Sequence, residues 1–378
     1  MPNDVLADLK GIDPACLTDV VRQDQRNDSF EISAWSVRRL SEQGMANPNG
    51  LWRFSGTGHA GGAERPWSVV LKILTRPKEE QPAHDLWYWK RELLVAESGL
   101  TERLPGPVKA PRFYRCPSQP ETWLWMEHIH DTQPGLWPLE NFRFAARELG
   151  RWNGAMVLAG PPPADPWLGR RHYRTWLQWL DPERHWQFPL LQKHASAELR
   201  ARWDQLWAER EEFFWVLETL PLVFCHADTQ RRNLAIRPGR DQANELVVLD
   251  WGLCGLAPLG VEMAMCVFGN LALIEWRPSA ASALDATVFD AYIAGLHAAG
   301  WLGEVGPVRL AFTAWIAVFL GLVYPAAMHD FCGPEARDSC LRNFRMAEEE
   351  LFLEYLSGMV YALDRAEEAR ALIRHLKV

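Results

Sequence analysis

A group of polar residues between positions 226 and 250 has the types and the spacing that phosphate chemistry needs. His226, Asp228 and Asn233 form the pattern H-x-D-x-x-x-x-N. Asp250 follows later in the chain and opens a D-W-G triplet. Between Asn233 and Asp250, two short apolar runs enclose a turn rich in breakers, which predicts a β-hairpin.

The predicted hairpin brings Asn233 and Asp250 side by side at its open end. An amide oxygen and a carboxylate held together form an oxygen site that suits Mg²⁺, which prefers phosphate as a further ligand. Asp228 lies on the loop before Asn233, within reach of a hydroxyl group beside a metal-bound phosphate. Each residue alone would be explained as a loop cap, but the joint pattern favours phosphoryl transfer.

This stretch resembles the catalytic loop and metal-binding triplet of the aminoglycoside phosphotransferase-type kinases, which are small-molecule relatives of the protein kinases. The resemblance implies that Asp228 is the catalytic base and that Asn233 and Asp250 bind Mg²⁺. It also implies that His226 supports the loop.

Other positions near this loop depart from the family pattern. The segment 255–262 resembles the family's G-P-x-x-x-D stretch, with Glu262 replacing the acid. We expect Glu262 to be a structural residue rather than a substrate contact. Gln230 stands where such kinases usually carry Lys or His near the transferred phosphate, and Arg231 or Arg232 are alternative sources of that positive charge.

The resemblance requires a lysine for the α- and β-phosphates and a helix glutamate that holds it. Lys72 is the lysine of an apolar strand, and a buried lysine needs a partner. Glu92, on a helix predicted over 85–98, is the natural partner. The alternatives are an edge strand for Lys72 and a solvated helix face for Glu92.

Three further segments are relevant to the nucleotide. Residues 56–61 match G-x-G-x-x-G, but the strand ending in Lys72 follows them, so we predict a hairpin turn there. We give the phosphate-covering role to 41–50, which includes Asn49 and Gly50. A strand over 123–129 would lead into the hinge. The backbone groups expected to meet the adenine are those of Glu127, His128 and Ile129.

These elements predict an α+β chain with a two-lobed protein-kinase-like fold. The N-lobe, 1–130, would hold a small antiparallel sheet, and the C-lobe, 131–378, would be larger and mainly helical, with the catalytic loop at 224–252. Strands are expected at 33–40, 51–54, 66–74, 112–115 and 122–127, with one further β region at 223–250.

Residues 166–220 are rich in tryptophan and lie where the family places its acceptor-binding helices. These rings either form an aromatic wall for a sugar or a cationic amine, or pack between helices. Asp181 and Glu183 are nearby polar residues that either contact the acceptor or are simply solvated. The tryptophans are Trp167, Trp176, Trp179, Trp186, Trp203, Trp207 and Trp215.

The chain has 378 residues, with 40 Lys+Arg against 48 Asp+Glu and a net charge of −8. The length suits two lobes, and the acidic balance argues against a nucleic-acid partner. No signal peptide is visible, and the uncharged run 310–328 contains Gly321 and Pro325, which favours a buried helix over a membrane span. We therefore expect a cytoplasmic protein with no membrane partner.

The cysteines are scattered along the chain and form no C-x-x-C pair. Disulfide frameworks are typical of small secreted chains, and zinc sites need close pairs. We therefore expect free thiols in a reducing cytosol. The seven residues are Cys16, Cys116, Cys225, Cys254, Cys266, Cys332 and Cys340.

The expected function is Mg²⁺-dependent transfer of the γ-phosphate of ATP (or GTP) to a hydroxyl of a small molecule: an aminoglycoside, another amino sugar, a sugar or an amino alcohol. The alternative is a nucleotide-binding pseudokinase that regulates a partner, for which Gln230 is the only support. A kinase of protein hydroxyls is disfavoured, since no activation segment is recognisable between Gly252 and Glu262.

Overall fold

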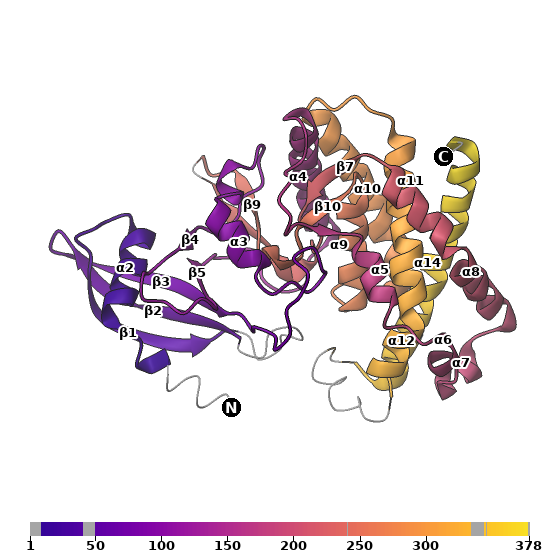
Figure 1. Ribbon diagram of the computed structural model, residues 1–378, viewed down its shortest axis with the longest axis horizontal. Coiled ribbons are helices and arrows are strands. Elements are labelled where there is room, and N and C mark those ends of the chain that lie inside the picture. The colour runs from indigo at the N-terminus through magenta and orange to yellow at the C-terminus, as the bar shows by residue number, and fades with distance from the viewer. Residues whose placement is uncertain (1–8, 41–49, 240, 334–343, 345, 377–378) are drawn as a thin grey trace.

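The computed structural model describes residues 9–40, 50–239, 241–333, 344 and 346–376. An antiparallel five-stranded sheet lies at one end of the molecule and a mainly helical region at the other (Figure 1). The strand order is β1-β2-β3-β5-β4. The bounds are β1 Glu31–Arg39, β2 Leu51–Ala60, β3 Ala63–Ile73, β4 Phe113–Tyr114 and β5 Trp123–Glu127.

Strand alternation in β3 separates two packing faces. Val69 and Leu71 pack toward helix α2 (Pro14–Gln25). Val70, one residue apart, packs with Leu93 of helix α3 (Arg91–Ser98) instead. Because side chains alternate along a strand, Lys72 shares the α3 face with Val70.

Strand β2 is longer than predicted, and the turn is shorter. The glycine-rich segment 56–60 continues the strand, and the turn contains Gly61 and Gly62, both with positive φ. A Cβ at Gly56 would lie 1.9 Å from the carbonyl oxygen of Ala34, on the neighbouring strand. These glycines therefore permit close packing of the strands, and the prediction of a turn is wrong for residues 56–60.

Helix α3 is also shorter than the predicted 85–98, since it begins at Arg91. The preceding residues form turns whose carbonyl groups, at Ala83, Asp85 and Leu86, accept hydrogen bonds from the Arg91 side chain. The side chain of Arg91 thus holds these turns in place, where the sequence predicts the first turn of the helix.

Two further small sheets follow in the C-terminal part of the chain. One has the order β6-β10-β7, with β6 Gly169–Arg170, β10 Gly255–Pro258 and β7 Leu222–Cys225. The other is the hairpin of β8 (Leu234–Pro238) and β9 (Asn244–Val248), as predicted. The helices are α4 Leu139–Leu158, α5 His172–Leu177, α6 Pro182–Trp186, α7 Pro189–His194, α8 Ala197–Thr219, α9 Val261–Ala272, α10 Ala281–Ala298, α11 Val305–Trp315, α12 Leu322–Phe331 and α14 Glu348–Leu376, with a π-helical segment Ile316–Gly321 between α11 and α12.

One continuous helical run, Val305–Phe331, is the part of the described chain that has the length and hydropathy of a membrane span. Of its most apolar window, 89% is buried within the protein. The run includes the predicted core helix over 310–328, and its apolar character is explained by packing against α8, α9 and α14.

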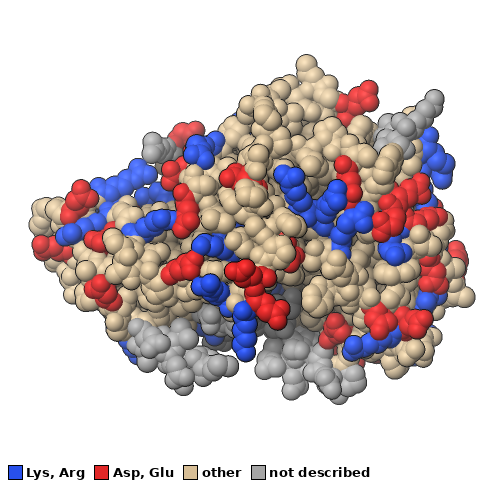
Figure 2. Space-filling model, in the orientation of Figure 1, with Lys and Arg blue, Asp and Glu red and all other residues tan. Residues whose placement is uncertain are grey.

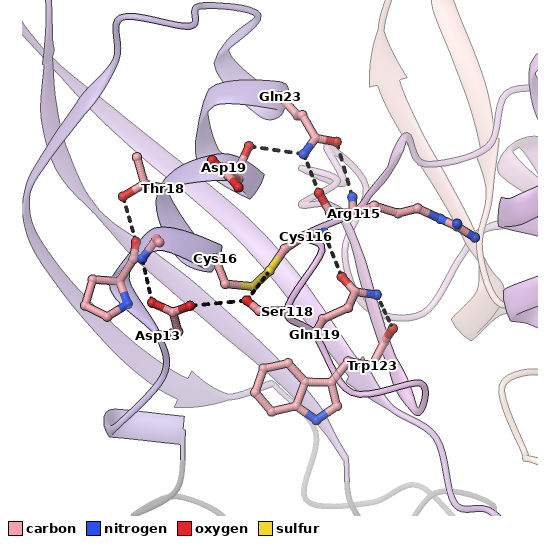
Figure 3. The surroundings of a disulfide bond; sticks show 12 residues. Asp13, Cys16, Thr18, Asp19, Gln23, Arg115, Cys116, Ser118, Gln119 and Trp123 are labelled. Carbon is pink, nitrogen blue, oxygen red and sulfur yellow. Dashed lines mark hydrogen bonds between the residues drawn. A yellow bond between two sulfur atoms is a disulfide. The ribbon is translucent and has the colours of Figure 1, made fainter.

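The prediction of free thiols is wrong for Cys16 and Cys116, which form a disulfide bond between α2 and the loop after β4 (Figure 3). Gln23 of α2 also bonds to both backbone groups of Arg115 in that loop. The partners are 100 residues apart in sequence, so their spacing gave no sign of the pairing. Cys225, Cys254 and Cys266 are free and buried, and Cys332 is also buried.

Removing this disulfide is expected to lower the free energy of unfolding by about 2–5 kcal/mol, because it closes a long loop in the unfolded chain. The measurement is urea denaturation of the oxidised chain and of Cys16→Ser/Cys116→Ser. Reduced wild type is the control and should unfold with the double variant. Equal midpoints for the oxidised chain and the double variant would contradict the prediction.

Candidate active site

Lys72 lies between two carboxylates from distant parts of the chain. Its Nζ is 2.6 Å from Oε2 of Glu92 on α3 and 2.8 Å from Oδ1 of Asp250, which follows β9. Lys72 and Glu92 are buried, whereas the Asp250 side chain is 45% exposed. The predicted contact between Lys72 and Glu92 is present, and Asp250 is an additional partner.

The electrostatics of this cluster favour the charged forms of Lys72 and Asp250, whereas burial raises the pKa of Glu92. Burial alone lowers the pKa of Lys72, but the carboxylates of Asp250 and Glu92 outweigh it and raise the pKa above its ordinary value. The partial burial of the Asp250 carboxylate raises its pKa, but the ammonium group of Lys72 outweighs this effect and lowers the pKa. Lys72 is therefore a fixed cation beside an ionised, accessible Asp250.

The β8–β9 hairpin places Asn233 and Asp250 together. The backbone N–H of Leu249 donates to the carbonyl oxygen of Asn233 over 2.8 Å. The residues that precede and follow the paired strands are thus neighbours, as the sequence predicts. Asp250 has φ 58°, and Ala227, just before Asp228, has φ 62°. Backbone strain of this kind is typical of sites where the surrounding structure fixes a functional side chain.

Asp228 accepts hydrogen bonds from two side-chain amides. Nδ2 of Asn233 is 2.6 Å from Oδ2 of Asp228, and Nε2 of Gln230 is 3.1 Å from its Oδ1. Burial, helped by the charge of Asp250, raises the pKa of Asp228 to about 8, although both amides oppose this shift. Gln230 therefore orients the carboxylate instead of supplying a cation.

Neither arginine considered from the sequence supplies that cation. The guanidinium of Arg231 faces the 131–137 segment, where it bonds to Asp131 at 2.7 Å and stacks on Trp137. Arg232 pairs with Glu275 at 2.6 Å. Arg231 is thus a structural residue that holds the catalytic loop against the chain segment entering α4.

Two oxygen atoms at the hairpin end suit a divalent cation. Within the described residues, Oδ1 of Asn233 and Oδ2 of Asp250 accept no hydrogen bond, since the other atoms of these side chains make the contacts given above. An amide oxygen and a carboxylate oxygen are hard ligands that fit Mg²⁺. No cluster of three or more His, Cys, Asp or Glu side chains with metal-site geometry occurs in the described part of the chain.

Glu262, at the start of α9, holds the catalytic loop through hydrogen bonds to its backbone. Its two carboxylate oxygens accept hydrogen bonds from the backbone N–H groups of His226 and Ala227, at 2.8 and 3.3 Å. It is fully buried, and burial raises its pKa to about 7 despite those bonds. His226 is also buried, and its ring packs edge-on against Trp251. Both contacts agree with structural roles.

A Glu262→Gln variant tests this burial. A carboxyl with a pKa of about 7 in the folded chain and 4.5 ordinarily favours folding below about pH 4.5, and this contribution is lost as the pH rises to about 7. Between about pH 5 and pH 8, the unfolding free energy of Glu262→Gln should fall less than that of wild type, by up to about 3 kcal/mol. Exposed Glu183→Gln is the matched control. Parallel curves for Glu262→Gln and wild type would contradict the assignment.

Arg91 is a functional residue that sequence analysis missed. It is fully buried beside Glu92 and donates to the carbonyl oxygens of Trp167, at 2.7 Å, and Gly252, at 2.8 Å. It therefore fixes the helix that carries Glu92 to the D-W-G triplet. A single arginine in a helical pattern usually lies in solvent, so no signal in the sequence distinguishes it.

The structure describes only some of the residues that are predicted to contact the nucleotide. Asn49 and nearly all of the predicted phosphate-covering segment lie outside the described residues. Gly50 lies directly before β2 and has φ 79°. The backbone N–H of Glu127 donates to the carbonyl oxygen of Arg112, and the carboxylate of Glu127 contacts Arg112 and Arg237. The side chain of Glu127 is therefore structural. Among the hydrogen bonds of turns, loops and caps in the described chain, none involves the backbone of His128 or Ile129.

Of the two alternatives for the tryptophans of 166–220, packing describes most of them. Trp167, Trp186 and Trp203 are buried, whereas Trp179 and Trp215 are exposed. Asp181 caps α6 by accepting a bond from the Arg184 N–H.

One row of rings connects α9, the helix that packs against Gln230, with the turns before α3. Gly269 packs against Gln230, and next to it Phe268 contacts Phe319. Phe319 contacts Trp176, which contacts Trp87, 42% exposed and in the turns before α3.

Comparisons with known proteins agree on the fold. A family model described as the phosphotransferase enzyme family matches residues 62–302. Choline kinase from Cryptosporidium parvum Iowa II is 12% identical, with a TM-score of 0.50, and the alignment covers 90% of this chain and 91% of that one. Amicoumacin kinase, in complex with AMP-PNP, Ca²⁺ and Ami, is 12% identical with a TM-score of 0.46, over 83% and 88% of the two chains. No curated protein sequence matches significantly. The chain has the two-part, protein-kinase-like α+β fold that the sequence predicts.

Proposed function

The chain belongs to the phosphotransferase enzyme family, and from this premise we propose that it transfers the γ-phosphate of ATP, or of GTP, to a hydroxyl group of a small molecule. The observation that carries the proposal is the joint arrangement of Lys72, Asp228 and Asp250. Lys72 binds Asp250 at 2.8 Å, and Asp228 is held by Asn233 at 2.6 Å. A fixed cation, a metal site and a base are the parts that phosphoryl transfer needs.

The proposal assigns a role to each of these side chains. Lys72, positioned by Glu92, binds the α- and β-phosphates. Asn233 and Asp250 hold Mg²⁺, which when bound neutralises charge on the phosphates. Asp228 accepts the proton of the attacking hydroxyl, and Gln230 and Asn233 keep its carboxylate in place. The backbone of His128 and Ile129 receives the adenine.

The acceptor would lie beside Gln230, along the row of rings that ends at Trp87. Aromatic faces attract the apolar faces of sugars and the cationic groups of amines. The structural relatives include a choline kinase and an amicoumacin kinase, so small polar molecules are the first acceptors to test.

The test couples ADP release to a panel of aminoglycosides, sugars and amino alcohols, with Mg-ATP or Mg-GTP as donor. We expect one class of acceptor to stimulate turnover. If the nucleotide raises the melting temperature but no acceptor stimulates turnover, a regulatory nucleotide-binding protein becomes the better assignment. If neither nucleotide binds, the proposed function is wrong.

A further inference from the structure

An apolar cavity of about 420 Å³ lies on the helical region, where α4 ends and α11 begins. Its walls include Met156, Val157, Val223, Phe224, Trp301 and Val308. Strand β7 forms one wall and then enters the catalytic loop, so the cavity lies behind the loop and outside the site described above. Figure 1 shows the loop between α10 and α11 at the edge of the helical region.

Several apolar side chains in or next to the walls of this cavity are exposed. Leu302, in the loop next to the wall residue Trp301, is 93% exposed, and Leu158 is 58% exposed. Val157, Leu222 and Val305 are also exposed. A contiguous apolar surface around a cavity is typical of a protein interface.

Charge indicates which partner fits. The whole chain has a net charge of −8, so two copies repel each other across most of their surfaces. The segments at the cavity, 156–163, 219–224, 257–260 and 299–308, contain a single charged residue, Glu304. Figure 2 shows the corresponding edge of the helical region as largely uncharged. This face allows two acidic copies to meet without repulsion.

We propose that this surface is the interface of a symmetric homodimer, in which Leu302 enters the cavity of the second copy. A twofold interface must be self-complementary, and here the projecting side chain and the cavity lie on the same patch. The cavity volume of about 420 Å³ is larger than a leucine side chain. Burial of Leu302 removes the most exposed large apolar side chain of the described chain from water.

The test is the mass of the full chain in solution, by light scattering after gel filtration at about 1–100 µM. Wild type is expected at twice the chain mass of 43.3 kDa. Leu302→Glu on the projecting side and Val157→Arg at the cavity mouth should each give a monomer with an unchanged circular dichroism spectrum. Leu136→Glu is the matched control, because Leu136 is another exposed leucine (72%) outside this surface, and it should remain dimeric.

Two results would overturn the proposal. One is a wild-type monomer at every concentration; binding of the neutral fluorescent probe N-phenyl-1-naphthylamine to that monomer, lost in Val157→Arg, would then assign the cavity to a small apolar ligand. The other is a dimer that persists in both Leu302→Glu and Val157→Arg, which would place the contact elsewhere. Neither measurement depends on turnover.

Discussion

Replacement of Asp228 with alanine is expected to lower kcat for phosphoryl transfer by about 10²–10⁴-fold, the usual contribution of a positioned general base. Asp228 is held by Asn233 and Gln230 on a loop whose backbone is strained at Ala227, so its carboxylate is fixed in direction. In the part of the chain that the structure describes, no other carboxylate contacts these two amides. The measurement is steady-state ADP release with the acceptor that stimulates wild type.

The loss should be in the chemical step and not in nucleotide binding. Mg-ATP should therefore raise the melting temperature of Asp228→Ala as it does that of wild type. The matched control is Asp204→Asn, since Asp204 is an exposed acid on α8 that pairs with Arg200. An Asp228→Ala variant that retains wild-type kcat would exclude Asp228 as the base.

The features that sequence analysis predicted well are local ones. The β8–β9 hairpin follows from two apolar runs around a turn, and its geometry brings Asn233 beside Leu249. The contact of Lys72 with Glu92 follows because a buried lysine needs an opposite charge. In both cases a few neighbouring residues carry the physical requirement.

The features that were missed depend on what the fold brings together. The close approach of β1 requires the glycines of 56–60. In the sequence alone, such glycines indicate a turn. Cys16 and Cys116 meet only because α2 packs against the sheet. The direction of Arg231 is set by Asp131 and Trp137, and residues so far apart leave no local pattern.

Replacement of Lys72 with methionine is expected to reduce both activity and stability. The variant loses a fixed cation aimed at the phosphates, and kcat/KM should fall by about 10²–10³-fold. It also leaves Glu92, 3% exposed, as a buried charge without its partner, which should lower the free energy of unfolding by about 3–5 kcal/mol. The measurements are ADP-release kinetics and urea denaturation. Lys193→Met, an exposed lysine 3.8 Å from Glu349, is the control and should change neither.

A second substitution separates the two losses. In Lys72→Met/Glu92→Leu both charges are replaced by apolar side chains, so no unpaired carboxylate remains at position 92 and most of the lost stability should return. Activity should not return, because the phosphates still lack their cation. Asp250 does not alter this expectation, since its side chain is 45% exposed and water can solvate it. If the double variant recovers activity together with stability, Lys72 serves the fold and not the phosphates. If neither quantity falls in Lys72→Met, the buried ion pair is not the centre of the site.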